Sequence, residues 1–281
     1  MVKRAMETIR PRHKETHKGD YGHVFILAGS AGMTGAAYLA SQAALLSGSG
    51  LVTLGIPRSL NTIMEIKLTE VMTLPLDETR DQSLGEASEK KIMDFAQKAD
   101  VLAIGPGISG NKETQRLIRR VVEKSDKPVV LDADGINAYA EKPAELKKHR
   151  APLVLTPHPG EMSRITKKNV SNIQKDREGT AKKISREFSA VVLLKGYKTV
   201  VAEGNKVYVN ESGNPGMATG GVGDVLTGII ASLIGQGLEP FGAAKLASYV
   251  HGLAGDMAMR ERGEISIIAS DILAKLPAAF K

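Results

Sequence analysis

Cysteine and tryptophan are absent from the 281-residue chain. Without thiols the protein has no disulfide, no thiolate zinc site and no cysteine nucleophile, and nothing points to an oxidising compartment. No stretch reaches the roughly 18 apolar residues that a membrane-spanning helix needs, and the basic start of the chain lacks an apolar run typical of a signal peptide. We therefore expect a cytoplasmic protein with no membrane partner.

Aromatic side chains are scarce, at 4% of residues, so few are available to stack on nucleic-acid bases. The net charge is +7, but basic and acidic residues are interspersed along the chain. A nucleic-acid partner is therefore not expected. Attraction of a small polyanionic ligand explains the charge equally well.

Two common phosphate-handling motifs are also missing. The chain has no G-x-x-x-x-G-K-[ST] sequence, which excludes a Walker-type ATPase, and it lacks the H-R-D and D-F-G motifs of protein kinases. Any nucleotide chemistry must use a different fold.

Short β-branched runs alternate with segments of helical periodicity, which predicts a mainly parallel sheet covered by helices on both sides. Thr199 to Ala202 and Val207 to Val209 flank the turn Glu203-Gly204-Asn205, and this pattern predicts a hairpin and an antiparallel edge. The other predicted strands are His23 to Ala28, Leu51 to Ile56, Val101 to Ile104, Pro128 to Leu131, Leu153 to Thr156 and Val191 to Leu194, and the clearest helices are Ala36 to Ser47, Glu89 to Lys98, Glu113 to Lys124 and Lys175 to Phe188.

The most informative segment is rich in glycine and runs from Gly213 to Asp224, directly before an apolar helical stretch. Small residues that open a helix expose backbone N–H groups at the positive end of the helix dipole, where they can hold a transferred phosphoryl group. Asp224 could then take the proton of an attacking hydroxyl, although it could also merely complement the helix N-terminus. The predicted anion hole consists of Gly220, Gly221, Val222 and Gly223.

A second glycine pattern, from Gly105 to Gly110, matches G-x-G-x-x-G after a strand, with Asp132 downstream. Pro106 removes a backbone donor where a pyrophosphate needs one, so we do not favour a Rossmann site. Asp132 and Asp134 could bind magnesium through water or hold backbone N–H groups, and Glu161 is equally ambiguous. None of the three is taken as a metal ligand.

The motif Thr156-Pro157-His158-Pro159-Gly160-Glu161 and the late Gly-Asp motif that ends at Asp224 occur together in this chain. Six other motifs accompany them in order: His17-Lys18-Gly19-Asp20-Tyr21-Gly22, Gly29-Ser30, Thr34-Gly35-Ala36-Ala37, Ile104-Gly105-Pro106-Gly107, Asp132-Ala133-Asp134 and Lys195-Gly196-Tyr197-Lys198-Thr199. From about His17 to the C-terminus the chain resembles the NAD(P)H-hydrate dehydratase family. The resemblance implies a ribokinase-like fold, a three-layer α/β/α sandwich with a mainly parallel central sheet and an antiparallel edge hairpin.

The resemblance further implies removal of water from the S epimer of hydrated NADH or NADPH, with ADP or ATP as phosphoryl donor and magnesium alongside the nucleotide. ADP is the expected donor and would give AMP and phosphate. Asp224 would deprotonate the hydrate hydroxyl. Ala36, Gly107, His158 and Asp224 would contact the hydrated dinucleotide, and Lys195, Gly196, Tyr197, Lys198, Thr199 and Gly223 would contact the nucleotide.

Each of these roles has a simpler structural alternative. Ala36 could only begin a helix, Gly107 could only serve a turn, and His158 could only be a loop histidine. For the whole chain, the alternatives are a kinase of the same fold acting on a small alcohol, in which the phosphoester is the stable product, and a nucleotide-binding protein without catalysis.

Family members tend to be homo-oligomers, often tetramers, and are often fused to an epimerase that interconverts the two hydrate epimers. We therefore expect a homo-oligomer and an epimerase as functional partner. Residues 1–16 are predicted to be a basic leader or the tail of a fused upstream domain, and residues 17–281 a single catalytic domain.

Overall fold

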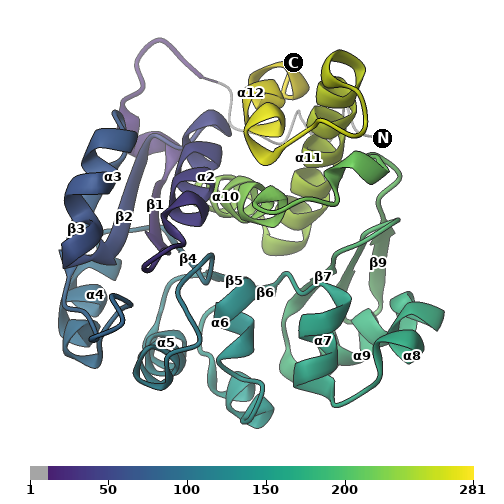
Figure 1. Ribbon diagram of the computed structural model, residues 1–281. Helices are drawn as coiled ribbons and strands as arrows, with labels where there is room; N and C mark the ends of the chain where they lie inside the picture. Colours follow the sequence, from purple (N-terminus) through teal and green to yellow (C-terminus); the bar gives the residue numbers. More distant parts are fainter. Residues whose placement is uncertain (1–11) are drawn as a thin grey trace.

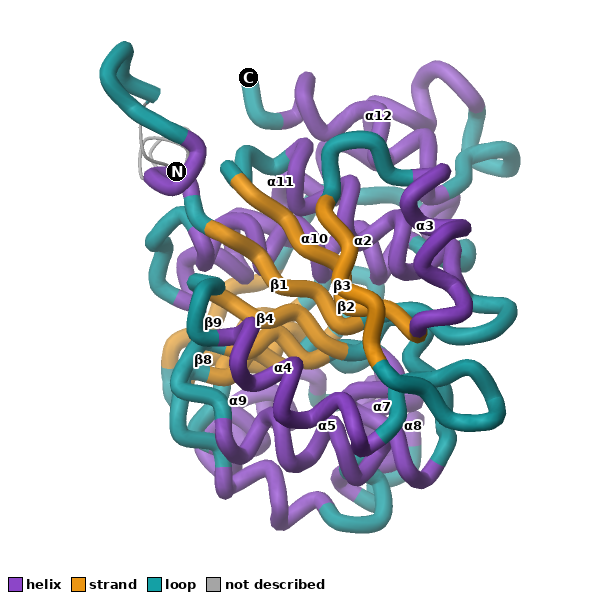
Figure 2. Tube along the Cα trace, turned by 90° about the vertical axis from the view of Figure 1, so that its left-hand side faces the viewer, coloured by secondary structure: helices purple, strands orange, loops and turns teal. Residues whose placement is uncertain are grey.

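A nine-stranded sheet lies between the helices of the protein, drawn in orange in Figure 2. The computed structural model describes residues 12–281. The strand order is β3-β2-β1-β4-β5-β6-β7-β8-β9; β1 to β7 pair in parallel, and β8 pairs antiparallel with both β7 and β9. The strands are β1 (His23–Leu27), β2 (Leu51–Pro57), β3 (Met72–Leu76), β4 (Val101–Ile104), β5 (Val129–Leu131), β6 (Leu153–Leu155), β7 (Val191–Leu194), β8 (Val200–Glu203) and β9 (Lys206–Val209).

The predicted parallel sheet with an antiparallel hairpin at its edge is confirmed. The sequence pattern does not predict β3, because Pro75 interrupts it and most of its side chains are only partly buried. β3 pairs with β2 alone, and an edge strand tolerates proline because one row of its backbone groups needs no partner. The predicted helix from Lys175 to Phe188 begins later than expected, since the side chain of Asp176 caps a new helix at Arg177.

Helices cover both faces of the sheet and make it the middle of three layers, as Figures 1 and 2 show. One face carries α2 (Thr34–Leu46), α3 (Asn61–Lys67), α10 (Val222–Gly235), α11 (Pro240–Arg262) and α12 (Ala269–Ala279). The other carries α4 (Glu89–Ala96), α5 (Lys112–Lys124), α6 (Ala133–Asn137), α7 (Pro159–Thr166), α8 (Val170–Lys175) and α9 (Arg177–Phe188). Helix α10, which follows the last strand in the sequence, thus returns to cover the first strands.

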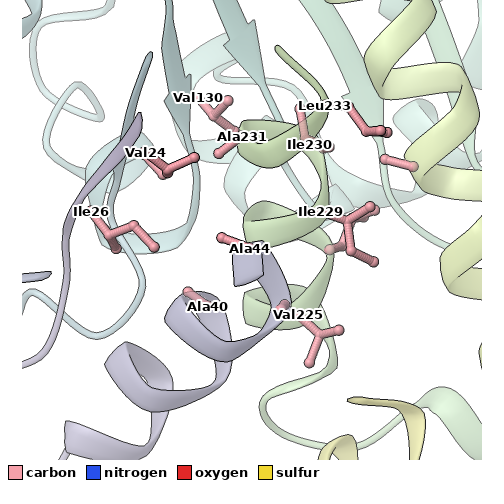
Figure 3. Packing of buried hydrophobic residues seen from close by; sticks show 14 of the residues in the cluster. Val24, Ile26, Ala40, Ala44, Val130, Val225, Ile229, Ile230, Ala231 and Leu233 are labelled. Carbon is pink, nitrogen blue, oxygen red and sulfur yellow. The ribbon is translucent and has the colours of Figure 1, made fainter. Parts of the chain in front are cut away.

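Strand side chains alternate between the two helical layers. Val24 and Ile26 of β1 join the core under α2 and α10, whereas Phe25 and Leu27 join the core on the opposite face. Figure 3 shows the first of these cores. Because both faces of the central strands are buried, these strands are apolar along their length, and the polar residues that could carry chemistry follow their carboxyl ends.

Helices α10 and α2 approach closely where α10 has a glycine, and Figure 3 shows the two helices side by side, with Ala40 and Ala44 on α2. A Cβ added to Gly228 would overlap the carbonyl oxygen of Ala40 and lie 2.8 Å from the Cβ of Ala43. We expect Gly228→Ala to lower the free energy of unfolding by about 2–3 kcal/mol, because the two helices must separate. Gly242→Ala in α11 is the control, since nothing lies within 4 Å of its added Cβ. Denaturant melts that rank the two variants equally would contradict this packing.

Within residues 12–281, no helix is both long and apolar enough to span a bilayer. Of the predicted leader at residues 1–16, the first eleven residues lie outside the described part of the chain.

Candidate active site

The chain reverses its direction across the sheet between β1 and β4, and ligands of such sheets bind beyond the carboxyl ends of the strands at that point. Hydrogen bonds join the segment that follows β1 to the segment that follows β4. The Gly29 N–H donates to the Pro106 carbonyl and the Ser30 hydroxyl to the Gly107 carbonyl, both at 2.8 Å. A Cβ added to Gly107 would lie 3.1 Å from the Cβ of Ala36 in α2. Two of the residues expected to contact the dinucleotide are therefore neighbours.

The glycine pattern from Gly105 to Gly110 does not open a helix. Helix α5 begins later, at Lys112, and Asn111 caps it. A Cβ at Gly105 would overlap the carbonyl oxygen of Asp132, so this glycine lets the ends of β4 and β5 approach each other. The segment shapes the sheet edge and has none of the helix N-terminus that a Rossmann pyrophosphate site uses.

Helix α10 begins at the predicted anion hole. Gly221 caps it with a φ of 87°, a left-handed conformation that favours glycine. The amides of Asp224 and Val225 donate to the Gly221 carbonyl at 3.1 and 3.2 Å, so the amides of Val222 and Gly223 are the ones left at the open end of the helix. These amides and the helix dipole favour an anion there.

Asp224 lies in the first turn of this helix and has an unusual acidity. Burial, the largest cause, and the negative charge of Asp132 together raise its pKa to about 7, although the ammonium of Lys195 opposes the shift. A carboxylate that holds its proton near neutral pH is a stronger base than an ordinary aspartate. The side chain is thus suited to accept a hydroxyl proton.

Asp132 connects the ends of three neighbouring strands to α10. It follows β5, is 1% exposed, and accepts hydrogen bonds from Lys195 Nζ at 2.6 Å, Thr156 Oγ1 at 2.7 Å and Thr227 Oγ1 at 2.8 Å. Thr156 follows β6, Lys195 follows β7, and Thr227 lies one turn beyond Gly223 in α10. The carboxylate of Asp132 therefore binds side-chain donors rather than the neighbouring backbone N–H groups.

The ammonium of Lys195 is held among three carboxylates, those of Asp132, Glu161 and Asp224, which we call the acidic group. It lies 2.6 Å from Asp132 and 3.9 Å from Glu161, and it would be 3.3 Å from a Cβ placed on Gly223. Burial lowers the pKa of Lys195, but the charges of Asp132, Glu161 and Asp224 outweigh this effect and raise the pKa overall. A fixed positive charge therefore lies beside the helix end that is suited to a phosphoryl group.

His158 and Glu161 cap helix α7 reciprocally. The backbone N–H of Gly160 donates to Nδ1 of His158 at 2.9 Å, and the Glu161 carboxylate accepts a hydrogen bond from the backbone N–H of His158 at 2.8 Å. Burial and the charge of Lys195 lower the pKa of His158, while burial raises the pKa of Glu161 to about 7. In the neutral ring, Nδ1 accepts and Nε2 carries the proton, 3.3 Å from Glu161 Oε1. The His158 side chain is 48% exposed, so a ligand can reach it.

The segment predicted to bind the nucleotide divides into an inward and an outward part. Lys195 turns into the acidic group, whereas Tyr197 is 88% exposed and the Lys198 ammonium lies 5.8 Å from its ring. The Thr199 hydroxyl donates to the Gly196 carbonyl at 3.0 Å and closes the turn. Lys195 is therefore placed for phosphoryl chemistry, and the outer residues are free to contact the remainder of a nucleotide.

Sequence reasoning gave no role to three residues of this site, although Thr156 belongs to the motif that ends at Glu161. Thr156 and Thr227 hold Asp132, and His251 of α11 lies 3.0 Å from the Val222 carbonyl at the start of α10. Burial lowers the pKa of His251 to about 4, so the ring is neutral and Nε2 can donate to this carbonyl. Thr227 and His251 could have been found as polar residues within otherwise apolar helical stretches, and both are buried in the structure.

A cavity of about 350 Å³ lies at the other end of the strands, with Leu153, Val191 and Glu203 in its lining. None of the acidic group around Lys195 lines it. The two carboxyl groups whose pKa is raised to about 7, those of Glu161 and Asp224, and the open helix end all lie at the carboxyl edge, so we place the candidate site there.

Comparison with known proteins identifies the family of the chain. Residues 24–278 match a family described as NAD(P)H-hydrate dehydratase. The chain is 48% identical over 267 residues to the bifunctional NAD(P)H-hydrate repair enzyme Nnr of Moorella thermoacetica, covering 95% of this chain and 50% of that protein. It is 38% identical over 271 residues to the ADP-dependent (S)-NAD(P)H-hydrate dehydratase of Neisseria meningitidis, covering 94% of this chain and 85% of that one. The chain thus spans about half the length of the bifunctional relatives it matches.

The fold is similar to that of the ADP/ATP-dependent NAD(P)H-hydrate dehydratase of Bacillus subtilis, a protein co-crystallised with ATP and Mg²⁺. The TM-score is 0.83 at 31% identity, with 100% of this chain and 98% of that chain covered. The chain therefore belongs to the NAD(P)H-hydrate dehydratase family and has a ribokinase-like fold.

Proposed function

We propose that this chain dehydrates the S epimers of hydrated NADH and NADPH, with ADP or ATP as phosphoryl donor, and so repairs the damaged cofactors. The observation that carries the proposal is the pairing of Asp224, whose pKa is raised to about 7, with the open end of α10 and the Lys195 ammonium. Family membership and the ADP dependence of the Neisseria relative support it.

The chemistry needs a base, a phosphoryl site and a leaving group. Asp224 takes the proton of the ring hydroxyl, which attacks the terminal phosphorus; the bond from that phosphorus to its bridging oxygen breaks, and AMP leaves when ADP is the donor. The phosphate then departs from the ring carbon with the C–O electron pair while the ring nitrogen donates its lone pair. Loss of a proton from the adjacent carbon restores the dihydronicotinamide. Hydroxide, a poor leaving group, is thereby replaced by phosphate.

The residues divide this work by position. The amides at Val222 and Gly223, with Gly220 and Gly221 before them, would hold the oxygens of the transferred phosphoryl group. Lys195 would neutralise the charge that develops there, and its outward neighbours through Thr199 would hold the adenine nucleotide. Ala36, Gly107 and His158 would bind the hydrated dinucleotide.

Magnesium would reach the site on the nucleotide. Among the residues described, no three acidic or histidine side chains gather into a ready ion cage. Phosphate oxygens and water would therefore supply its ligands, and the ion would reduce repulsion between the phosphates and the incoming oxygen.

Partners follow from the same proposal. An epimerase that converts the R hydrate into the S hydrate would supply the substrate. We expect the chain to work as a homo-oligomer such as a tetramer, which size-exclusion chromatography with light scattering can test.

Product analysis distinguishes this function from the small-alcohol kinase. We expect purified protein, ADP and hydrated NADH to yield AMP, inorganic phosphate and NADH in equal amounts by chromatography and phosphorus NMR. A stable phosphorylated alcohol, formed from a small alcohol while the hydrate remains unchanged, would support the kinase instead.

His158 can be tested apart from its capping role. Asparagine is a good N-cap, so His158→Asn should keep the start of α7 and change the free energy of unfolding by less than about 0.5 kcal/mol. We expect the KM for the hydrate to rise about tenfold, with the KM for the nucleotide unchanged, because a ring contact to the dinucleotide is lost. If both KM values stay at the wild-type level, His158 only caps the helix.

A further inference from the structure

Arg177, the first residue of α9, lies against the point where the chain leaves β7. Its Nη2 donates to two consecutive carbonyl oxygens, those of Leu194 at 2.8 Å and Lys195 at 3.1 Å. Nη1 donates to Gln174 Oε1 at 2.8 Å and would be 2.9 Å from a Cβ at Gly196. The planar guanidinium therefore fixes the backbone of the turn from Lys195 to Gly196.

This turn determines where the side chains on either side of it point. It points the Lys195 side chain back to Asp132, 2.6 Å away, and it points Tyr197 and Lys198 out to solvent. A turn without Arg177 would have two carbonyl groups to satisfy by other means, and the position of the Lys195 ammonium would be less defined.

The charge of Arg177 is also unusual. Within residues 12–281 it forms no ion pair with a carboxylate, and its Nε is buried without an acceptor. Burial lowers the pKa of its guanidinium, although an arginine remains protonated. A cation without a counter-ion behind this turn favours a polyanion in front of it.

We propose that Arg177 is a positioning residue for the nucleotide: it fixes the turn from Lys195 to Gly196 and adds positive charge behind it. This inference rests on the proposed function only in taking Lys195 to Thr199 as the nucleotide segment. It does not require the hydrate to be the acceptor, so nucleotide binding alone can test it.

The test uses the full chain with Arg177→Gln, Arg177→Lys and, as a matched control, Arg186→Gln. Arg186 belongs to the same helix but donates to Asn205 in the β8–β9 turn, at the other end of α9. Isothermal titration with ADP and with ATP, each with magnesium, should show about tenfold weaker binding for Arg177→Gln and about threefold for Arg177→Lys, which keeps the charge without the planar pair of donors. Arg186→Gln should bind as the wild type does.

Steady-state kinetics separate positioning from a general loss of stability. In Arg177→Gln the KM for the nucleotide should rise about tenfold, while the KM for the hydrate stays at its wild-type value. If Arg177→Gln does not fold, the same measurements on Arg177→Lys decide the matter. Wild-type nucleotide affinity in a folded Arg177 variant would overturn the proposal.

The outcome for the wild type separates the two proposals. Nucleotide binding that depends on Arg177, in a protein that does not dehydrate the hydrate, would support the role of Arg177 and contradict the proposed function. A wild-type chain that binds neither nucleotide would overturn both.

Discussion

Asp224→Asn is expected to lose dehydration almost completely, with kcat lowered by about 10³-fold, while the protein becomes more stable at neutral pH. Asparagine cannot accept the hydroxyl proton, and general-base catalysis typically contributes about 10²–10⁴ in rate. Nucleotide affinity should stay within about threefold of wild type, since the helix end and Lys195 are unchanged. Rate assays and titration calorimetry on the same preparation measure both.

The expected gain in stability has a definite pH dependence. The pKa of Asp224 is raised to about 7 in the folded protein, against 3.8 ordinarily, so the folded state favours the protonated form. Wild-type stability is therefore lost as the pH rises from about 4 to above 7, and Asn, which carries no charge, avoids that loss. Each pKa unit corresponds to about 1.4 kcal/mol, and allowing for solvent screening at this partly exposed carboxylate we expect a gain of about 2 kcal/mol above pH 7.

Asp134→Asn provides a control for Asp224→Asn. Asp134 accepts hydrogen bonds from the Ser109 amide and from Asn137, and its charge also contributes to the raised pKa of Asp224. Its replacement should change kcat by less than about threefold. Substantial dehydration by Asp224→Asn would remove Asp224 as the base, and a loss of stability above pH 7 would contradict the account of its pKa.

Lys195→Met is expected to have the second large effect, on stability and on rate together. It leaves the carboxylate of Asp132, 1% exposed, without its cation, and breaking a buried ion pair typically costs about 3–5 kcal/mol. Removing a preorganised charge from the phosphoryl site should lower kcat by about 10²–10³-fold. Because Lys195 lowers the pKa of Asp224, the acid limb of the pH–rate profile should also move to higher pH.

A double variant separates these two effects. Asp132→Asn combined with Lys195→Met removes both charges, so most of the lost stability should return while the rate remains low. Lys206→Met, which breaks an exposed pair with Glu203, should leave both unchanged. If the double variant regained the wild-type rate, Lys195 would serve only to neutralise Asp132.

Local pattern was sufficient to predict the parts of the site that lie within one segment. The glycines before α10 predicted both the helix start and Asp224 in its first turn, and the apolar runs predicted every parallel strand except β3. Strand β3 was not predicted because Pro75 interrupts its run of apolar residues, and a strand can be predicted reliably only from an uninterrupted pattern. Ala36, beside Gly107, came from family resemblance alone, since nothing in its own residue type indicates a ligand.

The contacts of Asp132 could not be predicted in the same way. Its carboxylate meets Lys195 and Thr227, which lie 63 and 95 residues further along the chain. Only the order of β5, β6 and β7 in the sheet, together with the return of α10 over the first strands, brings these side chains together. The sequence left the choice between metal binding and backbone capping open for Asp132, and the structure shows a third arrangement, a buried carboxylate that orients an ammonium.

The most direct test of the central claim follows the near-ultraviolet absorption band of reduced nicotinamide after hydrated NADH is mixed with the protein and magnesium. Parallel reactions contain ADP, ATP or no nucleotide, with Asp224→Asn protein as the blank. We predict recovery of the band only when a nucleotide is present, and none with the variant. No recovery with either nucleotide, from wild-type protein shown to be folded and to bind that nucleotide, would contradict the proposed dehydration.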